Sequence, residues 1–180
     1  MRAPDCFCRQ LLDTLPRLRR YVRTLVFDAA QADDLAQNAL ERALAHWHQF
    51  DQRRDMLVWV LAIAHNAFLD SRRRDARLAI ADPDELRRLQ DQAGGDPGPD
   101  VGLRLDLQAA LRRLSPEQRE PLLLVCVEQL SYAEVAEVMQ IPVGTVMSRV
   151  CRARAALRQF LDGSAAAAPA AGGAALRRVV

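Results

Sequence analysis

The sequence contains no lysine, and arginine supplies all 25 of its basic side chains. It also lacks an apolar run of about 18 residues, the length that suits a membrane-spanning helix. Its first residues do not show the basic segment and apolar core that are typical of a secretory signal. From these absences we expect a soluble, cytoplasmic protein that does not insert directly into a membrane.

Patterns for catalysis or metal binding are missing as well. The four cysteines form no CxxC pair, no glycine-rich phosphate loop follows a strand, and no Ser/His/Asp order suggests a catalytic triad. An alternative is a metal held by residues whose spacing matches no common zinc pattern: Cys6, Cys8, His46, His48 and His65. We predict no enzyme activity, no metal and no cofactor. We expect Cys126 and Cys151 to be buried or half-buried thiols on apolar-rich helices.

Strand signals are scarce, because β-branched residues rarely alternate with polar ones and no Asn-Gly turn is present. Helical periodicities fill two blocks, residues 8–78 and residues 105–161. Between them, residues 79–104 hold six acids against three arginines and include the helix-breaking run GGDPGP. Residues 162–180 are rich in Ala, Gly and Pro, which predicts a disordered tail. The fold predicted is all-α, with two small helical domains joined by a flexible acidic linker.

The stretch SYAEVAEVMQIPVGTVMSRVCRARAALR, residues 131–158, is the most informative part of the chain. Ser131 and Glu134 form a capping box, which predicts that a helix begins there. Ile141-Pro142 ends this helix, because proline lacks an N–H group and disfavours helix in the residue before it. In the next helix, one apolar stripe recurs at helical spacing: Val146, Val150, Ala153 and Leu157. This layout predicts a helix-turn-helix, whose second helix enters the major groove of DNA.

Positive charge is concentrated on that second helix. Residues 141–160 hold four arginines and no acid, although the net charge of the whole chain is only +2. Thr145, Ser148 and Arg152 point away from the apolar stripe, and Arg149 flanks it. Arginine can pair with guanine through two hydrogen bonds or bind phosphate. The alternative is a solvated face, which is the usual role of an arginine-rich helix surface.

The pattern of apolar and capping residues in the first block, residues 8–78, predicts three helices. An apolar stripe over residues 15–25 follows Pro16, which suits a first-turn position. A helix at about 32–46 would carry two aspartates, at positions 33 and 34, in its first turn, where acids favour the helix dipole. A loop around Phe50 leads to a third helix at about 53–74. The residues predicted to be buried in the last two helices are Leu35, Ala39, Ala43, Leu57, Leu61, Ala64 and Phe68.

Four motifs occur in order along the two blocks. Residues 34–43, DLAQNALERA, resemble a DLVQETFLRA segment, and residues 59–66, WVLAIAHN, resemble WLxxIARN. Residues 114–119 read LSPEQR, and residues 141–149 read IPVGTVMSR, which is similar to IPVGTVxSR. These segments are those of the extracytoplasmic-function (ECF) sigma factors, the small two-domain group of bacterial sigma factors. The resemblance covers about residues 10–160.

The resemblance implies a promoter-specificity subunit of RNA polymerase. Residues 8–78 would be sigma region 2, which docks on core polymerase and opens the −10 element. Residues 105–161 would be sigma region 4, which binds the −35 element as duplex. The implied partners are the β′ and β subunits of core RNA polymerase, promoter DNA and an anti-sigma factor. The implied residues are Asp34, Gln37, Asn38, Glu41 and Arg42 for polymerase docking, Phe50, Asn66, Asp70 and Arg73 for the −10 element, and Thr145, Ser148, Arg149 and Arg152 for the −35 element.

Some positions depart from the family pattern, and the role of one residue has two possible interpretations. Met147 stands where the family usually has Arg or Lys, Asn38 replaces a usual Glu, and His65 replaces a usual Arg. Met56-Leu57-Val58 replaces a common Phe-Arg-Pro. Phe50 could stack on an unpaired base or belong to the core of the first block. These departures bear on the promoter sequence more than on the role.

A plain helix-turn-helix repressor or activator is the competing function. It would account for residues 115–160 equally well, but it leaves the first block without a role. Binding to core RNA polymerase discriminates between the two.

Overall fold

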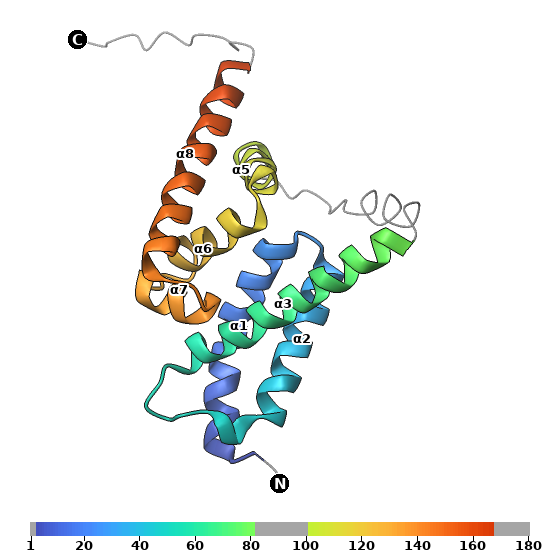
Figure 1. Cartoon of the computed structure of the whole chain (residues 1–180), viewed down its shortest axis with the longest axis vertical. Helices are drawn as coiled ribbons and strands as arrows, with labels where there is room; N and C mark the ends of the chain where they lie inside the picture. Colours follow the sequence, from blue (N-terminus) through green and yellow to red (C-terminus); the bar gives the residue numbers. More distant parts are fainter. Residues whose placement is uncertain (1–2, 82–100, 168–180) are drawn as a thin grey trace, which may run out of the picture.

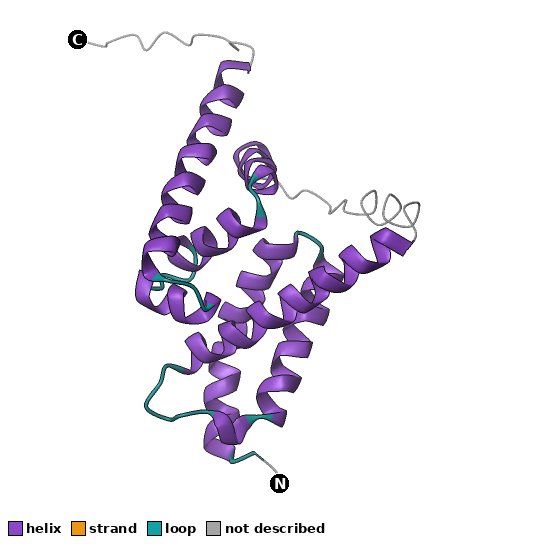
Figure 2. Ribbon diagram, viewed as in Figure 1, coloured by secondary structure: helices purple, strands orange, loops and turns teal. Residues whose placement is uncertain are grey.

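The computed structural model describes residues 3–81 and 101–167. All regular structure in these two ranges is helical, and they contain no strand (Figures 1 and 2). The helices gather into two groups, one from each range. The prediction of an all-α protein with two helical parts is therefore confirmed.

The first group begins with α1 (Asp5–Val26), a helix of 22 residues. The prediction that Pro16 occupies a first turn is wrong, because Pro16 lies inside α1 with an exposed side chain. The helix extends in front of this proline because Phe7 and Leu11 continue the apolar stripe and are buried together with Leu18. Burial of that longer stripe offsets the one backbone hydrogen bond that proline removes.

The second helix, α2 (Ala29–Ala45), starts earlier than predicted. Its N-cap is Asp28, whose carboxylate accepts a hydrogen bond from the backbone N–H of Gln31 at 2.7 Å. Asp33 and Asp34 therefore lie beyond the first turn, and the prediction that they occupy it is wrong. The predicted buried residues Leu35, Ala39 and Ala43 are indeed buried.

A 3₁₀ turn, η1 (Trp47–Gln49), and a loop lead to α3 (Met56–Ala81). Asp55 caps α3, since its carboxylate accepts hydrogen bonds from the backbone N–H groups of Leu57 at 2.7 Å and Val58 at 3.2 Å. The four predicted core positions of this helix are buried: Leu57, Leu61, Ala64 and Phe68. This face of α3 packs against α1 and α2.

The second group opens with α5 (Val101–Arg113) and α6 (Pro116–Cys126). Pro116 stands at the first position of α6, where proline is well tolerated, although the side chain of the N-cap Ser115 makes no capping hydrogen bond. Leu122, Leu123 and Leu124 are buried and form the centre of this group.

The helix-turn-helix follows as predicted, in α7 (Tyr132–Met139) and α8 (Val143–Ala167). Both hydrogen bonds of the Ser131–Glu134 capping box are present. Gln140, in the left-handed conformation with φ of 54°, ends α7. The predicted stripe of α8 is buried at Val146, Val150 and Ala153, and Leu157 is half-buried. The predicted linker, residues 79–104, and the predicted tail, residues 162–180, lie largely outside the described residues. Their bounds are wrong where helices enter them, because α3 continues to Ala81, α5 begins at Val101 and α8 continues to Ala167.

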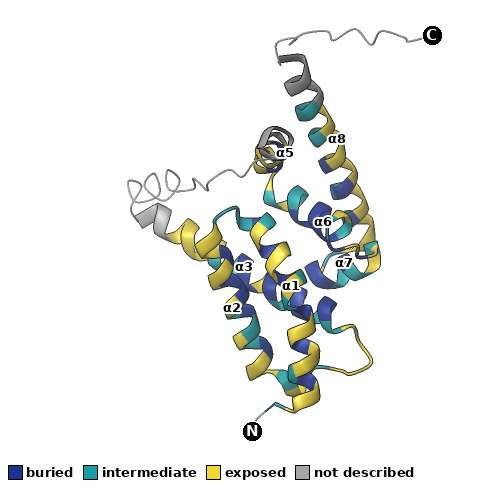
Figure 3. Ribbon diagram, turned by 180° about the vertical axis from the view of Figure 1, so that it is seen from behind, coloured by how far each residue is buried: buried dark blue, intermediate teal, exposed yellow. Residues whose placement is uncertain are grey.

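The two groups pack against each other through α1 with α6 and α3 with α7. Their buried apolar residues form one contiguous core. Figure 3 shows the buried positions gathering where these helices meet. The candidate DNA-binding helix α8 lies along the outer side of the second group (Figure 1).

Candidate nucleic-acid interface

The first turns of α8 carry the residues predicted to contact duplex DNA. Ser148 and Arg152 are exposed, and Thr145 is half-buried. The hydroxyl of Ser148 donates to the carbonyl of Thr145 at 3.0 Å, and Nε of Arg152 donates to the carbonyl of Ser148 at 3.3 Å. These bonds join neighbouring turns of α8, so the structure brings the three residues together as a polar strip along the helix surface.

Arg149 differs from this strip because another helix holds it. Its guanidinium lies 3.2 Å from a carboxylate oxygen of Glu117 in α6, and only 22% of its side chain is exposed. Glu117 itself is 72% exposed, so solvent screens the pair and its contribution to stability is small. Arg149 therefore flanks the strip, and DNA contact through it would compete with Glu117.

Two further exposed side chains on α8 are Met147, which the sequence marked as a departure from the family pattern, and Cys151, whose exposure was not predicted. Met147 is 52% exposed, and Cys151 is exposed as well. The prediction that Cys151 and Cys126 are buried or half-buried is wrong, because both thiols are exposed. The signal for Cys151 was available: it follows Val150 by one residue, which turns its side chain about 100° away from the buried stripe. Cys126 ends α6 and accepts a hydrogen bond from Arg154 at 3.7 Å.

The predicted −10 residue Phe50 packs in an aromatic cluster of the first group. Its ring centroid lies 5.2 Å from that of Trp59 and 5.9 Å from that of Phe7. Phe50 is half-buried and packs against the core. This packing favours the core role among the two that the sequence left open.

Asn66, another predicted −10 residue, is exposed on α3 beside a shallow pocket. The pocket has a volume of about 240 Å³ and combines aromatic, aliphatic and hydrogen-bonding side chains. Its lining residues are Arg42, His46, Gln49, Trp59, Ile63 and Asn66. Such a lining suits an unpaired base, which is held by stacking and by edge hydrogen bonds.

Asp70 and Arg73 complete the predicted −10 set, and the structure joins them to a residue predicted for polymerase docking. Arg42 of α2 donates to the carboxylate of Asp70 in α3 at 3.1 Å. Arg73 lies 3.8 Å from the other oxygen of that carboxylate. The three side chains remain substantially exposed, so this is a surface network rather than a buried one. Arg42, which was predicted for polymerase docking, thus lines the pocket beside Asn66 and contacts α3 through Asp70.

The other residues predicted for polymerase docking lie along α2. Asp34, Gln37 and Glu41 are exposed, and the amide of Gln37 donates to Glu41 at 2.9 Å. Asn38 is half-buried, and its side-chain oxygen is buried without a hydrogen-bond partner among the described residues. Asp34 and Asn38 line a surface pocket of about 560 Å³ between α2 and α3. The structure therefore brings these four residues onto one side of α2.

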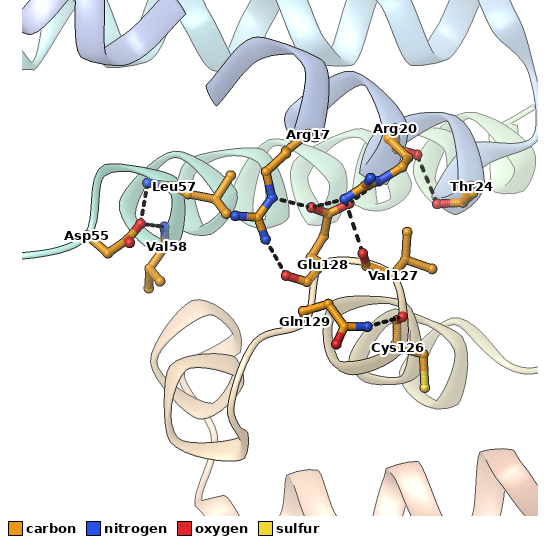
Figure 4. A network of polar contacts seen from close by, with 10 residues as sticks. All are labelled: Arg17, Arg20, Thr24, Asp55, Leu57, Val58, Cys126, Val127, Glu128 and Gln129. Atoms are coloured by element: carbon orange, nitrogen blue, oxygen red, sulfur yellow. Dashed lines mark hydrogen bonds and ion pairs between the residues drawn. The ribbon is translucent and has the colours of Figure 1, made fainter. Parts of the chain in front are cut away.

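A polar network that sequence reasoning did not predict joins the two helix groups (Figure 4). Glu128, which follows α6, is fully buried, and both Arg17 and Arg20 of α1 hold its carboxylate. The distances are 3.1 Å from Nε of Arg17 and 3.0 Å from Nε of Arg20. The hydrogen bond and the negative charge of Glu128 raise the pKa of Arg20 above its ordinary value. The two arginines also donate to the backbone carbonyls of Val127 and Glu128.

A second buried carboxylate crosses the same contact. Oε1 of Glu120 in α6 accepts a hydrogen bond from the hydroxyl of Tyr21 at 2.6 Å and lies 2.5 Å from Nδ1 of His65. All three side chains are buried. Burial, followed by the charge of Glu120, raises the pKa of Tyr21 well above 10.0. At the edge of the contact, Arg54 pairs with Glu137 of α7.

Two features are absent from the described part of the chain. Within it, no cluster of three or more His, Cys, Asp and Glu side chains is arranged to bind a metal ion. Nor does any described helix combine the length and the apolar character required to cross a membrane.

Comparison with known proteins identifies both halves of the chain. Residues 104–157 match the family model for sigma-70 region 4, and residues 11–65 match the model for the Sigma2 domain of PhyR. The chain is 35% identical to the ECF RNA polymerase sigma factor EcfG of Rhodopseudomonas palustris, over 87% of this chain and 86% of that protein. It is 36% identical to the ECF RNA polymerase sigma factor SigC of Mycobacterium tuberculosis, over 72% and 70%.

Solved structures are similar to this chain as well. The sigma factor RpoE in complex with the anti-sigma factor NepR, from Bartonella quintana, superimposes with a TM-score of 0.73 and 29% identity. That match covers 88% of this chain and 98% of RpoE. CnrH in complex with the cytosolic domain of CnrY gives a TM-score of 0.62 and 26% identity.

Proposed function

The chain belongs to the ECF RNA polymerase sigma factors, and from this premise we propose that it binds core RNA polymerase through the β′ and β subunits and directs it to specific promoters. The observation that carries the proposal is the exposed strip of α8, in a segment with four arginines and no acid. A plain helix-turn-helix regulator would leave the sigma-like match of residues 11–65 without a role. The work of this protein would take place in the cytoplasm, where polymerase and promoter meet.

The −35 element is proposed to bind the strip of α8 as duplex. Ser148 and Arg152 would reach base edges or phosphates first, because both are exposed. Thr145, at the start of the same strip, and Arg149, on its flank, would support them. Phosphate contacts by arginine release counterions, so affinity for the −35 duplex should fall steeply as salt is raised.

The −10 element is proposed to bind the first helix group as single strand. The pocket beside Asn66 offers the Trp59 ring and polar groups for one unstacked base. Asp70 and Arg73 lie further along the same helix and would contact the next part of the strand. Phe50 would act through Trp59, against which it packs, by fixing the wall of the pocket.

Core polymerase is proposed to dock on the exposed side of α2. Asp34, Gln37, Asn38 and Glu41 lie there, and Arg42 at the edge would link this surface to the −10 pocket. A polar surface of mixed charge suits a reversible protein interface. An anti-sigma factor would control the protein, as the similar RpoE forms a complex with the anti-sigma factor NepR.

Binding of a −35 duplex by matched arginine variants tests the assignment. We expect Arg152→Ala to lower affinity about 5- to 150-fold, the range for losing one bidentate arginine contact. Arg158→Ala removes the same charge from a later turn of α8 and should change affinity less than about threefold. Binding to core polymerase should be unchanged in both variants. Equal losses in the two variants would contradict a specific role for the exposed strip.

A further inference from the structure

Two large apolar side chains are exposed on the first turns of α8. Val143 is 42% exposed and Met147 is 52% exposed. They stand four residues apart, so they lie next to each other on one side of the helix. The buried side of α8 is already formed by Val146 and Val150, so this exposed pair has no place in the core.

The surroundings of this apolar pair are those of the proposed DNA surface. Ser148 adjoins Met147 in the sequence and is exposed, and Arg152 follows one turn later. Residues 141–160 contain no acid that would repel a phosphate backbone. The pair is therefore continuous with a cationic surface that suits DNA and disfavours a similarly basic partner.

The major groove offers one apolar group to such a side chain, the C5-methyl group of thymine. We infer that Met147, supported by Val143, packs on a thymine methyl group within the −35 duplex and so helps to set the promoter sequence. The inference rests on the proposed function of α8. It gives Met147 a role in recognising a base, at the position where the family usually has Arg or Lys. A flexible thioether side chain adapts well to such a contact.

Replacement of thymine by uracil tests this contact, because it removes only the methyl group. A −35 duplex selected by the wild-type protein is prepared with each thymine replaced singly, and affinity is measured at constant salt. At one thymine, we expect the wild-type protein to lose about fourfold in affinity, as burial of one methyl group implies. Met147→Ala should bind the thymine and uracil forms equally.

Two further variants serve as controls. Met147→Leu keeps an apolar side chain of similar size and should keep most of the thymine preference. Leu12→Ala removes another exposed apolar side chain, 64% exposed on α1, and should leave the fourfold ratio unchanged. Circular dichroism is used to check that each variant retains its helices.

The outcomes separate this inference from the function on which it rests. Methyl-insensitive binding at every thymine, or an equal methyl effect in wild type and Met147→Ala, overturns the inference while −35 binding stands. That result would assign the apolar pair to a protein partner instead. Failure of the wild-type protein to select any −35 duplex overturns the proposed function itself.

Discussion

Glu120 and Glu128 place two carboxylates in the contact between the helix groups, and each is held by side chains from the other group. Buried carboxylates are costly unless they are paired and hydrogen-bonded. Here the pairing is complete: Glu128 meets two arginines, and Glu120 meets Tyr21 and His65. These residues therefore fix how the groups meet, because a shifted contact would leave a buried charge without a partner.

The raised pKa of Tyr21 predicts a loss of stability in alkali. A raised pKa means that the folded state holds the phenolic proton more tightly than the unfolded state does. Its stabilising effect is complete below the unfolded-state pKa of about 10 and is lost as the pH rises beyond that value. Urea unfolding between pH 8 and pH 11 should show this fall, and Tyr21→Phe should make it shallower. Tyr132→Phe, which removes the other tyrosine, is the matched control. A slope unchanged by Tyr21→Phe would contradict the assignment.

The sequence predicted only some of these features of individual side chains. The exposure of Ser148 and Arg152 follows from helical periodicity and was predicted. The pairing of Arg149 with Glu117 was not, because it joins helices that the sequence does not place relative to each other. The packing of the Phe50 ring could not be predicted either, because its neighbour Phe7 lies in a stretch of α1 that was not predicted to be helical.

Among the elements, α7 shows how closely a local signal can define a helix. Its capping box involves residues only three positions apart, so the start was readable without tertiary information. The start of α1 was misplaced for the opposite reason. Proline favours a first turn in general, yet burial of Phe7 and Leu11 extends the helix past it. Local rules define helix ends well only where tertiary burial agrees with them.

The capping box also predicts a stability difference. Ser131→Ala should lower the free energy of unfolding by about 1 kcal/mol, because the N–H of Glu134 loses its acceptor. Ser115→Ala at the start of α6 is the matched control, because Ser115 makes no side-chain capping bond. It should cost only a few tenths of a kcal/mol. Urea unfolding measures both, and equal costs would show that the capping box contributes nothing specific.

At the scale of the whole molecule, the proposed function predicts a change in how the two groups pack. The −10 and −35 elements lie about 25 base pairs apart, which is about 85 Å of duplex. In the described structure the two groups are in direct contact instead, through α1 with α6 and α3 with α7. The contact was not predictable from the sequence, because Arg17 and Glu128 are separated by 111 positions. We therefore expect the two groups to move apart when the protein binds both promoter elements.

Neutralising Glu128 should favour this separation. In Glu128→Gln we expect the contact to weaken by about 1–3 kcal/mol, less than for a fully buried pair because Arg17 and Arg20 remain 42% and 51% exposed. Energy transfer between dyes on the exposed Cys6 and Cys151, with Cys8 and Cys126 replaced by serine, reports the distance between groups. Transfer should fall in Glu128→Gln and stay nearly unchanged in the control Glu137→Gln, whose pair is exposed. Unchanged transfer in Glu128→Gln would contradict this role.

Transcription in vitro on genomic DNA tests the sigma-factor function most directly. Purified protein is added to core RNA polymerase, and the 5′ ends of the transcripts are mapped against those of core polymerase alone. We predict new start sites that share one −10 and one −35 sequence at fixed spacing, and their strong reduction with Arg152→Ala. Initiation no more specific than that of core polymerase alone would contradict the account.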